Sequence, residues 1–376
     1  MEPVNRDIRL NRLSLYQFKS YPEVSLEFDH AVVCFLGHNG AGKTNLLDAI
    51  HYLSFSKSYF HNVDAAHIAT GGEESAITGE FIRGEFPELI TCAWRKNQRK
   101  VLKRNHKEYD KLSQHIGLLP AVMITPYDVE LILEGSETRR RFIDATLSQV
   151  SPVYLDHLLQ YNQALQQRNA LLKQSGKSGS HHEALFEPWD HRLSHHGEAI
   201  FNQRKEFVES FQTLFETVYL HITGGKETPS LKYLTDLEDG PLLTQLTACI
   251  QKDRMLERTT KGIHKDEIEF YLDHRMIKRF GSQGQQKSFL ISLKLAQLMY
   301  LREKTGLNPL LLLDDLYDKL DESRVNNLLH WIGEFHRGQI FITDTHPDRI
   351  PALLSGLNLS FELWDVEDSK VVKRTA

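Results

Sequence analysis

The sequence predicts an α/β fold whose core is interrupted by a mainly helical insertion, and three observations support this prediction. Apolar runs at residues 31–36 and 310–313 are typical of buried strands. A Gly-rich loop joins the first of these runs to a helical pattern. Between residues 128 and 258, by contrast, apolar residues recur mostly at helical spacing. We therefore expect a core built from residues 1–127 and 259–376 and a helical lobe built from residues 128–258.

The elements of the expected core follow from local patterns. Alternating apolar and polar residues predict half-buried strands, and Asn105-His106 predicts a turn because asparagine tolerates left-handed backbone angles. The expected strands are residues 8–15, 23–28, about 75–81, 89–94 and 267–272, with a hairpin over 100–109. Apolar residues at helical spacing predict helices over 45–53 and 288–302.

The expected lobe consists of helices. The chain has 376 residues, which is long for one ordinary domain, so a second lobe is expected on length alone. Helical spacing predicts helices at 139–147, 154–172 and about 184–222. Residues 174–180, which contain two glycines and three serines, predict a flexible break before the last helix.

Composition and charge limit the class of protein. Apolar content of 40% and charged content of 25% are ordinary for a globular protein, and no run of 18 apolar residues suggests a membrane span. The polar N-terminus does not resemble a signal peptide, and the cysteines at 34, 92 and 249 form no metal or disulfide pattern. We expect a cytoplasmic protein in a reducing compartment. A net charge of −5 requires any nucleic-acid-binding surface to be local.

The segment from Gly37 to Thr44 fits the phosphate-binding pattern G-x-x-x-x-G-K-[ST]. Its glycines allow successive backbone N–H groups to surround phosphate oxygens, and the following helix adds a partial positive charge. Lys43 is expected to reach the β- and γ-phosphates of a nucleoside triphosphate, and the Thr44 hydroxyl to bind Mg²⁺. The alternative is a Gly-rich turn with a chance lysine, which the flanking strand and helix disfavour.

Two acids follow the apolar run at residues 310–313. A buried strand ending in a carboxylate is typical of the metal-linked acid of these nucleotide sites. Asp314 is therefore expected to hold Mg²⁺ through water, and Asp315 to orient the attacking water. The alternative is a core strand that ends in a solvated acidic turn.

A second small, Gly-containing loop, Phe280 to Lys287, precedes the expected helix 288–302. A loop at a helix N-terminus can bind an anion, and a second such loop suggests a site completed by another subunit. The alternative is an ordinary helix start in which Ser282 caps the helix.

Together these segments resemble the RecF family within the ABC-type ATPases, in family order over nearly the full length. The Ser-Gln-Gly-Gln-Gln and Gln-Arg-Asn segments are specific to that family, whereas the phosphate-binding loop is not. The matching residues are 37–50, 134–136, 139–144, 161–165, 167–169, 281–287 and 313–321.

The resemblance implies an ABC-type ATPase head in which two subunits close head to tail around two ATP molecules with Mg²⁺. Residues 282–284 of one subunit would face the γ-phosphate held by the other, and Asp318 to Asp321 would match a loop that crosses the dimer interface. Lys19 and Ser20 match a position near the nucleotide in related ATPases. The nucleotide-binding residues expected from the loop and the resemblance are Lys19, Ser20, Gly37, His38, Asn39, Gly40, Ala41, Gly42, Lys43, Thr44, Asn45, Ser282, Gln283, Gly284 and Gln285.

The chain departs from related ATPases at three places. Asp315 stands where most have Glu, which predicts slow hydrolysis because the shorter carboxylate reaches less far. In the switch region, Asp344 stands where many relatives have His, and His346 comes two residues later, so both are candidates for the γ-phosphate sensor. Residues 125–128 correspond to the Gln-loop and contain no Gln. The catalytic candidates are Lys43, Asp315 and His346.

A dense basic stretch is the candidate DNA surface. Several lysines and arginines that contact phosphates together give an affinity that falls steeply with salt, although alternate hairpin residues share a face. The alternative is an edge hairpin kept soluble by lysines. Of Arg139, Arg140 and Arg141, at least one is expected to pair with Glu134 or Glu137. The residues of the stretch are Arg95, Lys96, Arg99, Lys100, Lys103, Arg104 and Lys107.

The histidine pairs His181-His182 and His195-His196 lack metal-ligand spacing with acids or cysteines. A solvated helix face is the expected reading.

These features predict an ATP-gated DNA clamp and a weak, DNA-stimulated ATPase. The resemblance implies binding to junctions of single- and double-stranded DNA and work with RecR and RecO to help load RecA. The alternatives are an ABC-type ATPase that drives a transporter or a nuclease complex, and a small-molecule kinase. None of these accounts for both the Gln-Arg-Asn helix and the loop at residues 282–284.

Overall fold

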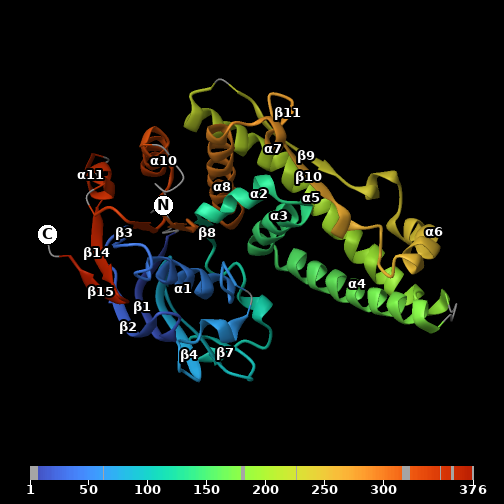
Figure 1. The fold of residues 1–376 in the computed structure, drawn as a ribbon, viewed down its shortest axis with the longest axis horizontal. Helices are drawn as coiled ribbons and strands as arrows, with labels where there is room; N and C mark the ends of the chain where they lie inside the picture. Colours follow the sequence, from blue (N-terminus) through green and yellow to red (C-terminus); the bar gives the residue numbers. More distant parts are fainter. Residues whose placement is uncertain are drawn as a thin grey trace. The chain divides into compact units, whose positions relative to one another are not determined.

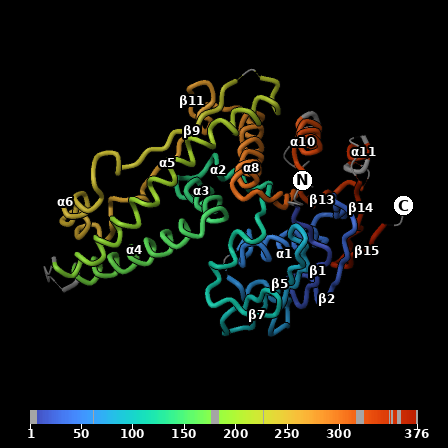
Figure 2. The backbone as a smooth tube through the Cα atoms, turned by 180° about the vertical axis from the view of Figure 1, so that it is seen from behind, coloured from blue at the N-terminus to red at the C-terminus, as the bar shows by residue number. Residues whose placement is uncertain are grey.

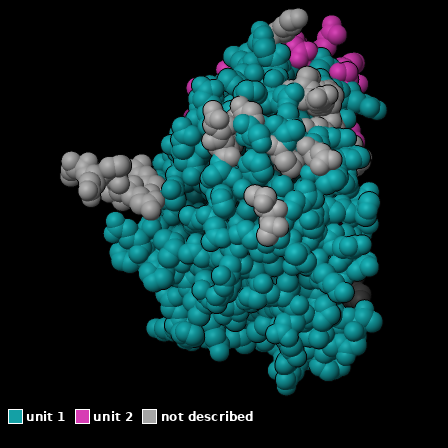
Figure 3. Space-filling model, turned by 90° about the vertical axis from the view of Figure 1, so that its left-hand side faces the viewer, with its two compact units in different colours: residues 1–129, 217–226, 283–376 teal, residues 130–216, 227–282 magenta. Residues whose placement is uncertain are grey.

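In the computed structural model, the chain forms two units, drawn in separate colours in Figure 3. The structure describes residues 7–61, 63–178, 183–225, 227–315, 322–347, 349–356 and 360–374. Unit 1 contains residues 1–129, 217–226 and 283–376, and unit 2 contains residues 130–216 and 227–282. The helical lobe predicted from the sequence ended at residue 258. Unit 2 also includes residues 259–282, because strand β10 within them pairs with β9 of the same unit.

The first sheet of unit 1 is antiparallel, with strand order β2-β1-β4-β5-β6-β7. Its strands alternate buried and exposed residues, as predicted for a sheet with one solvated face. The predicted hairpin is confirmed, with Asn105 and His106 at φ 50° and 68° in its turn. The strands are β1 (Ile8–Phe18), β2 (Tyr21–Glu27), β4 (Glu74–Arg83), β5 (Phe86–Arg95), β6 (Val101–Arg104) and β7 (Lys107–Glu108).

The second sheet of unit 1 has the order β15-β14-β3-β13-β12-β8 and is parallel except at β15. Every residue of β3 and β12 is buried, which confirms both predicted core strands. Because β13 lies between them, the ends of β3 and β12 share one edge of the sheet. The strands are β3 (Val32–Leu36), β8 (Ala121–Ile124), β12 (Leu310–Leu313), β13 (Ile340–Asp344), β14 (Phe361–Glu367) and β15 (Lys370–Lys373).

Helix α1 (Lys43–Phe55) packs between the two sheets, since it contacts β4 and β5 of the first and β8, β12 and β13 of the second (Figure 1). Nearly all of its residues are therefore buried. The helix carries the end of the phosphate-binding loop, so the core of unit 1 holds that loop in place. The other long helices within unit 1 are α8 (Gln283–Thr305), α10 (Glu322–Phe335) and α11 (Arg349–Gly356). Helix α8 confirms the helix predicted over 288–302.

Unit 2 combines helices with a three-stranded antiparallel sheet in the order β11-β10-β9. The predicted helices and the strand at 267–272 are present. The predicted break at 174–180 is wrong up to Ser178, because α4 continues to that residue. The elements are α2 (Glu130–Leu133), α3 (Ser136–Val150), α4 (Pro152–Ser178), α5 (Glu187–Thr223, which enters unit 1 at Thr217), β9 (Pro229–Leu234), α6 (Leu242–Met255), β10 (Glu267–Leu272), β11 (Arg275–Met276) and α7 (Ile277–Phe280).

Helices α4 and α5 run side by side and antiparallel (Figures 1 and 2). The direction follows from two contacts, since Tyr154 near the start of α4 meets Arg204 and Arg168 further along α4 meets Asp190. As residue numbers rise on α4, those of their partners on α5 fall.

Two fully buried arginines connect the elements of unit 2. Arg168 donates to Asp190 and to Asp253, each at 2.6 Å. Arg204 donates to both carboxylate oxygens of Asp144 at 2.8 and 3.0 Å and to Asp266 at 2.8 Å. Arg168 belongs to the family-specific Gln-Arg-Asn segment, so that segment has a structural role in this unit.

No helix within the described ranges is long and apolar enough to cross a membrane.

Candidate nucleotide-binding site

The phosphate-binding loop lies between β3 and α1, and two glycines are required by its geometry. Gly42 has a φ of 109°, and a Cβ there would lie 2.8 Å from the Tyr21 hydroxyl oxygen. A Cβ on Gly37 would lie 2.1 Å from the Val366 carbonyl oxygen. A side chain at either position would therefore displace the loop.

Lys43 is buried and folds back under its own loop. Its Nζ donates to the carbonyl oxygens of Gly37 at 2.7 Å and His38 at 2.9 Å. Burial lowers the pKa of Lys43, although the carboxylates of Asp315 and Asp314 act in the opposite direction. The loop thus holds a cation that a phosphate group could neutralise.

The structure brings together the two residues predicted to bind Mg²⁺. Thr44 Oγ1 lies 2.9 and 3.1 Å from the two carboxylate oxygens of Asp314. The Thr343 hydroxyl donates to Asp314 Oδ1 at 2.8 Å, and burial raises the pKa of Asp314. A hydroxyl and a carboxylate are the oxygen ligands that Mg²⁺ prefers, so these residues fit that ion.

A pocket opens at this edge of the sheet, and it contains Asp315 as well as the loop. The Asp315 backbone N–H donates to Thr343 Oγ1 at 2.9 Å, and its φ of 44° is unusual for a non-glycine residue. Such backbone conformations are concentrated at functional sites. Thr343 was not among the predicted site residues, because only Asp344 and His346 of the switch region were considered there as candidates. The pocket is lined by Asn39, Gly40, Gly42, Lys43, Thr44, Asn45, Asp315 and Thr343.

Lys19 and Ser20 contact α1 through different residues. Ser20 Oγ accepts a hydrogen bond at 2.9 Å from Asn45, which lines the pocket. Lys19 instead forms an ion pair at 2.5 Å with Asp48, which is fully buried. Gly37, His38 and Ala41 belong to the loop but do not line the pocket. The nucleotide contacts predicted for these residues stay predictions.

The two switch candidates differ in burial. Asp344 ends β13 and is fully buried, and its backbone carbonyl accepts the Gly37 N–H at 3.2 Å. Its Oδ1 accepts the backbone N–H of His346 at 2.6 Å, while its Oδ2 has no hydrogen-bond partner among the residues described. His346 is exposed and does not line the pocket. A sensor role for either residue stays a prediction.

The second glycine loop does not contribute to the pocket of its own chain. Gln283, Gly284 and Gln285 begin α8, and none of the three is among the pocket-lining residues that the structure describes. A Cβ on Gly284 would lie 2.8 Å from Arg324 Nη2, so the glycine allows close approach of that guanidinium. Ser282 is the last residue of unit 2. Asp318 to Asp321 lie outside the described residues.

The region that corresponds to the Gln-loop contains a buried ion pair instead. Asp128 accepts the Thr125 backbone N–H at 2.6 Å and pairs with Lys294 of α8 at 2.7 Å. Lys294 also donates to the Met123 carbonyl at 3.0 Å. Sequence reasoning missed this pair because its members are far apart in the chain.

Four members of the basic stretch are already paired with acids. The pairs are Arg95 with Glu74, Lys96 with Glu73, Lys100 with Asp64, and Arg104 with Glu88. The exposed cations of the stretch without an ion pair inside the described ranges are Arg99, Lys103 and Lys107. The predicted pairing of one of the three helix arginines is confirmed by Arg141 and Glu137. The candidate DNA surface therefore offers fewer available charges than its composition suggests.

Known proteins resemble this chain in sequence and in fold. Residues 9–351 match the RecF/RecN/SMC N terminal domain family. The DNA replication and repair protein RecF of Flavobacterium johnsoniae is 44% identical over 359 residues, which cover 96% of this chain and 100% of that protein. The solved structure of the recombination mediator protein RecF-ATP in the RecFOR pathway matches with a TM-score of 0.90 and 27% identity over 100% of both chains. A Smc head domain from Pyrococcus furiosus shares the fold, with a TM-score of 0.56 and 16% identity over 98% of this chain and 96% of that one.

Proposed function

Because the chain belongs to the RecF/RecN/SMC N-terminal domain family, and within it to the RecF proteins, we propose that it is an ATP-dependent DNA-binding protein of replication and repair. The observation that supports this proposal most directly is the composition of the pocket. The phosphate-binding loop and Asp315 line it, whereas residues 283–285 do not. Such a pocket supports a site that is complete only when a second copy supplies its own glycine loop.

Different residues of the pocket would contact the phosphates, the metal ion and the attacking water. The backbone of the loop and Lys43 would hold the phosphates of ATP. Thr44 and Asp314 would hold Mg²⁺, which neutralises phosphate charge when it is bound. Asp315 would orient the attacking water, and its shorter side chain supports slow hydrolysis. The protein is then a weak ATPase in which hydrolysis serves as a switch.

Dimerisation would convert ATP binding into DNA binding. Ser282, Gln283 and Gly284 of one copy would contact the γ-phosphate held by the other, so two ATP molecules would join two copies head to tail. DNA at a junction of single and double strands would lie across the dimer, and hydrolysis would release it. The RecFOR pathway of the solved relative supports RecO and RecR as partners, with RecA loading as the outcome.

Light scattering of the purified protein with and without ATP, repeated with a gapped duplex, tests this proposal. The wild type should become a dimer only with ATP. Lys43→Met should abolish both ATP binding and dimerisation, whereas Ser282→Arg should retain ATP binding and stay monomeric. Ser210→Arg places the same charge on an exposed position of α5 and should dimerise normally. If the wild type stays a monomer under every condition, or if Ser282→Arg dimerises, the clamp proposal is wrong.

A further inference from the structure

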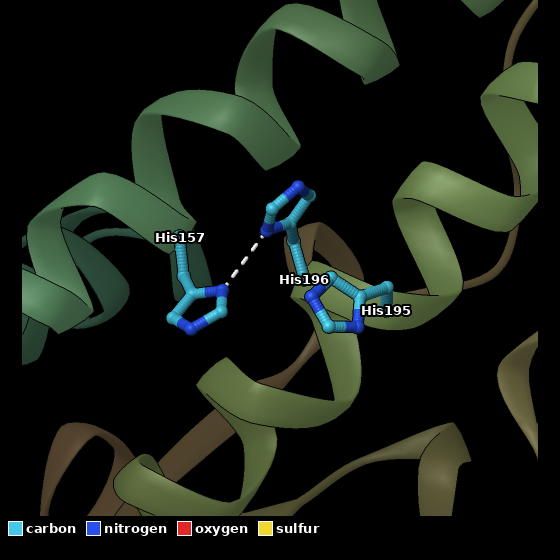
Figure 4. Close-up of side chains that lie close together, drawn as sticks. All are labelled: His157, His195 and His196. Atoms are coloured by element: carbon cyan, nitrogen blue, oxygen red, sulfur yellow. Dashed lines mark hydrogen bonds between the residues drawn. The ribbon is translucent and has the colours of Figure 1, made fainter.

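Three histidine rings converge in unit 2, and the nucleotide site does not use them. His157 lies on α4, and His195 and His196 lie on α5 (Figure 4). Each offers one ring nitrogen, and these nitrogens lie within 4.8 Å of one another. The Nδ1 atoms of His157 and His196 are 2.9 Å apart. The sequence predicted a solvated helix face for His195 and His196. His195 is exposed, but His196 and His157 are partly buried.

The antiparallel packing of α4 and α5 positions this histidine cluster, formed by His157, His195 and His196. Contacts between Tyr154 and Arg204 and between Arg168 and Asp190 fix the two helices on either side of it. Close to the cluster, a Cβ on Gly197 would lie 3.1 Å from the Tyr161 ring, so the helices approach closely there. The ring positions thus depend on a packed helix pair and not on a surface loop.

The spacing of the nitrogens suits a transition-metal ion. Nitrogens bound to one tetrahedral Zn²⁺ at about 2.0–2.1 Å lie roughly 3.3 Å apart. In the cluster one pair of ring nitrogens lies 2.9 Å apart and the three offered nitrogens lie within 4.8 Å of one another, so small side-chain rotations reach that spacing. The three rings are tilted by 58° to 69° to one another, not stacked, so their nitrogens can point to a common centre.

We propose that His157, His195 and His196 form a binding site for Zn²⁺ that joins α4 to α5. Imidazole is a preferred ligand of zinc, and three histidines leave a fourth position for water on the exposed side of His195. Two charged side chains, Asp156 of α4 and Arg192 of α5, lie near the His196 ring. The Arg192 guanidinium lies over the Trp189 ring at 5.3 Å, a contact within its own helix that holds it.

Metal counting on the untagged full-length protein tests the site. After dialysis against Zn²⁺ and desalting, the wild type should retain one zinc by plasma mass spectrometry. Loss of an outer-shell partner weakens metal binding by roughly 10–100-fold, and loss of a direct ligand should cost more. His157→Ala and His196→Ala should therefore each weaken zinc binding by more than about 100-fold. His191→Ala is the matched control, because His191 is exposed on the same helix and pairs with Glu187. The double variant His181→Ala, His182→Ala controls for binding by an adjacent pair of histidines.

Thermal melting supplies a second readout. An ion that binds the folded chain raises the melting temperature by mass action, so Zn²⁺ should stabilise the wild type and both controls but not His157→Ala. His157→Gln replaces the alanine variant if that variant fails to fold, as judged by circular dichroism and ATP binding. The proposal is overturned if His157→Ala retains as much zinc as the wild type, or if the double variant at 181 and 182 loses it.

Discussion

The buried arginines of unit 2 and the nucleotide site of unit 1 hold buried charge in different ways. In unit 2, the buried guanidinium groups of Arg168 and Arg204 each meet two carboxylates. In unit 1, buried Lys43 donates to backbone carbonyls, and buried Asp314 accepts from two threonine hydroxyls; within the described ranges, neither forms an ion pair. A paired charge in the interior maintains the arrangement of helices, whereas a charge without a counter-ion is available to a ligand. Buried charge therefore maintains the architecture around Arg168 and Arg204 and marks a site at Lys43 and Asp314.

Breaking a pair in unit 2 should have the largest effect on stability. Arg204→Met removes the cation that Asp144 and Asp266 share and leaves two carboxylates without it. We expect a loss of about 3–5 kcal/mol in the free energy of unfolding, measured by urea denaturation with circular dichroism. Because burial already raises the pKa of Asp266, this acid can take up a proton in the variant, and the loss should be smaller at acidic pH.

Lys205→Met is the matched control, since Lys205 is the exposed neighbour of Arg204 on α5. It should change the free energy of unfolding by about 0.5 kcal/mol or less. Equal stability of the two variants would mean that the buried pairing does not maintain unit 2.

Removing the negative charge of buried Asp314 in unit 1 should affect ATP hydrolysis and not stability. Asp314→Asn keeps the shape and the contacts with Thr44 and Thr343 but removes the negative charge. We expect ATP hydrolysis to fall roughly 100-fold or more, because a metal ion at such a site contributes several kcal/mol to the transition state. Its free energy of unfolding should stay within about 1 kcal/mol of the wild type, since burial of the charge is no longer required. A large loss of stability together with normal hydrolysis would mean that Asp314 stabilises the fold and does not serve the nucleotide site.

Part of the fold and of the site was predictable from the sequence. The strands β3, β10 and β12 and the loop from Gly37 to Thr44 were predicted because local periodicity and one motif determine them. The contact between Thr44 and Asp314 was predictable as well, since parallel strands two places apart end at the same edge of the sheet.

Contacts between distant segments were not predictable. The acid that pairs with Arg104 lies on the adjacent strand, and that register is not readable from the basic stretch alone. Thr343 reaches the pocket from β13, and His157 meets His196 only because α4 and α5 are antiparallel. Each of these requires knowledge of which elements are neighbours, which spacing along one element does not contain.

Lys19 was predicted to lie near the nucleotide, but in the structure it pairs with buried Asp48. A variant of Lys19 can show whether it stabilises the fold or binds the nucleotide. Burial alone would raise the pKa of Asp48, but Lys19, with smaller contributions from His51 and Ser58, holds this pKa below its usual value of 3.8. A carboxyl with a lowered pKa stabilises the fold above its unfolded pKa and loses that contribution as the pH falls through its folded pKa. Lys19→Met should therefore cost about 1–3 kcal/mol at pH 7, and the difference from the wild type should narrow as the pH falls and Asp48 takes up a proton.

Lys96→Met is the control, because its pair with Glu73 is exposed and should contribute about 1 kcal/mol or less. Thermal melting from pH 7 to pH 3 and ATP binding of the same variants give both readouts. Unchanged stability with lost ATP binding would assign Lys19 to the nucleotide site.

The smallest expected effect is a change in DNA binding when cations of the basic stretch are replaced. It should differ between cations that are paired with an acid and cations that are not. Lys103 and Lys107 are exposed on β6 and β7, whereas Lys96 already pairs with Glu73. If the hairpin contacts DNA phosphates, Lys103→Gln with Lys107→Gln should weaken binding and lower the slope of log affinity against log salt by about 2. Lys96→Gln should change that slope by less than about 1, because its charge is partly neutralised in the free protein. Binding measured by fluorescence anisotropy from 50 to 200 mM salt distinguishes the two, and an unchanged slope in the double variant would place the DNA contacts elsewhere on the protein.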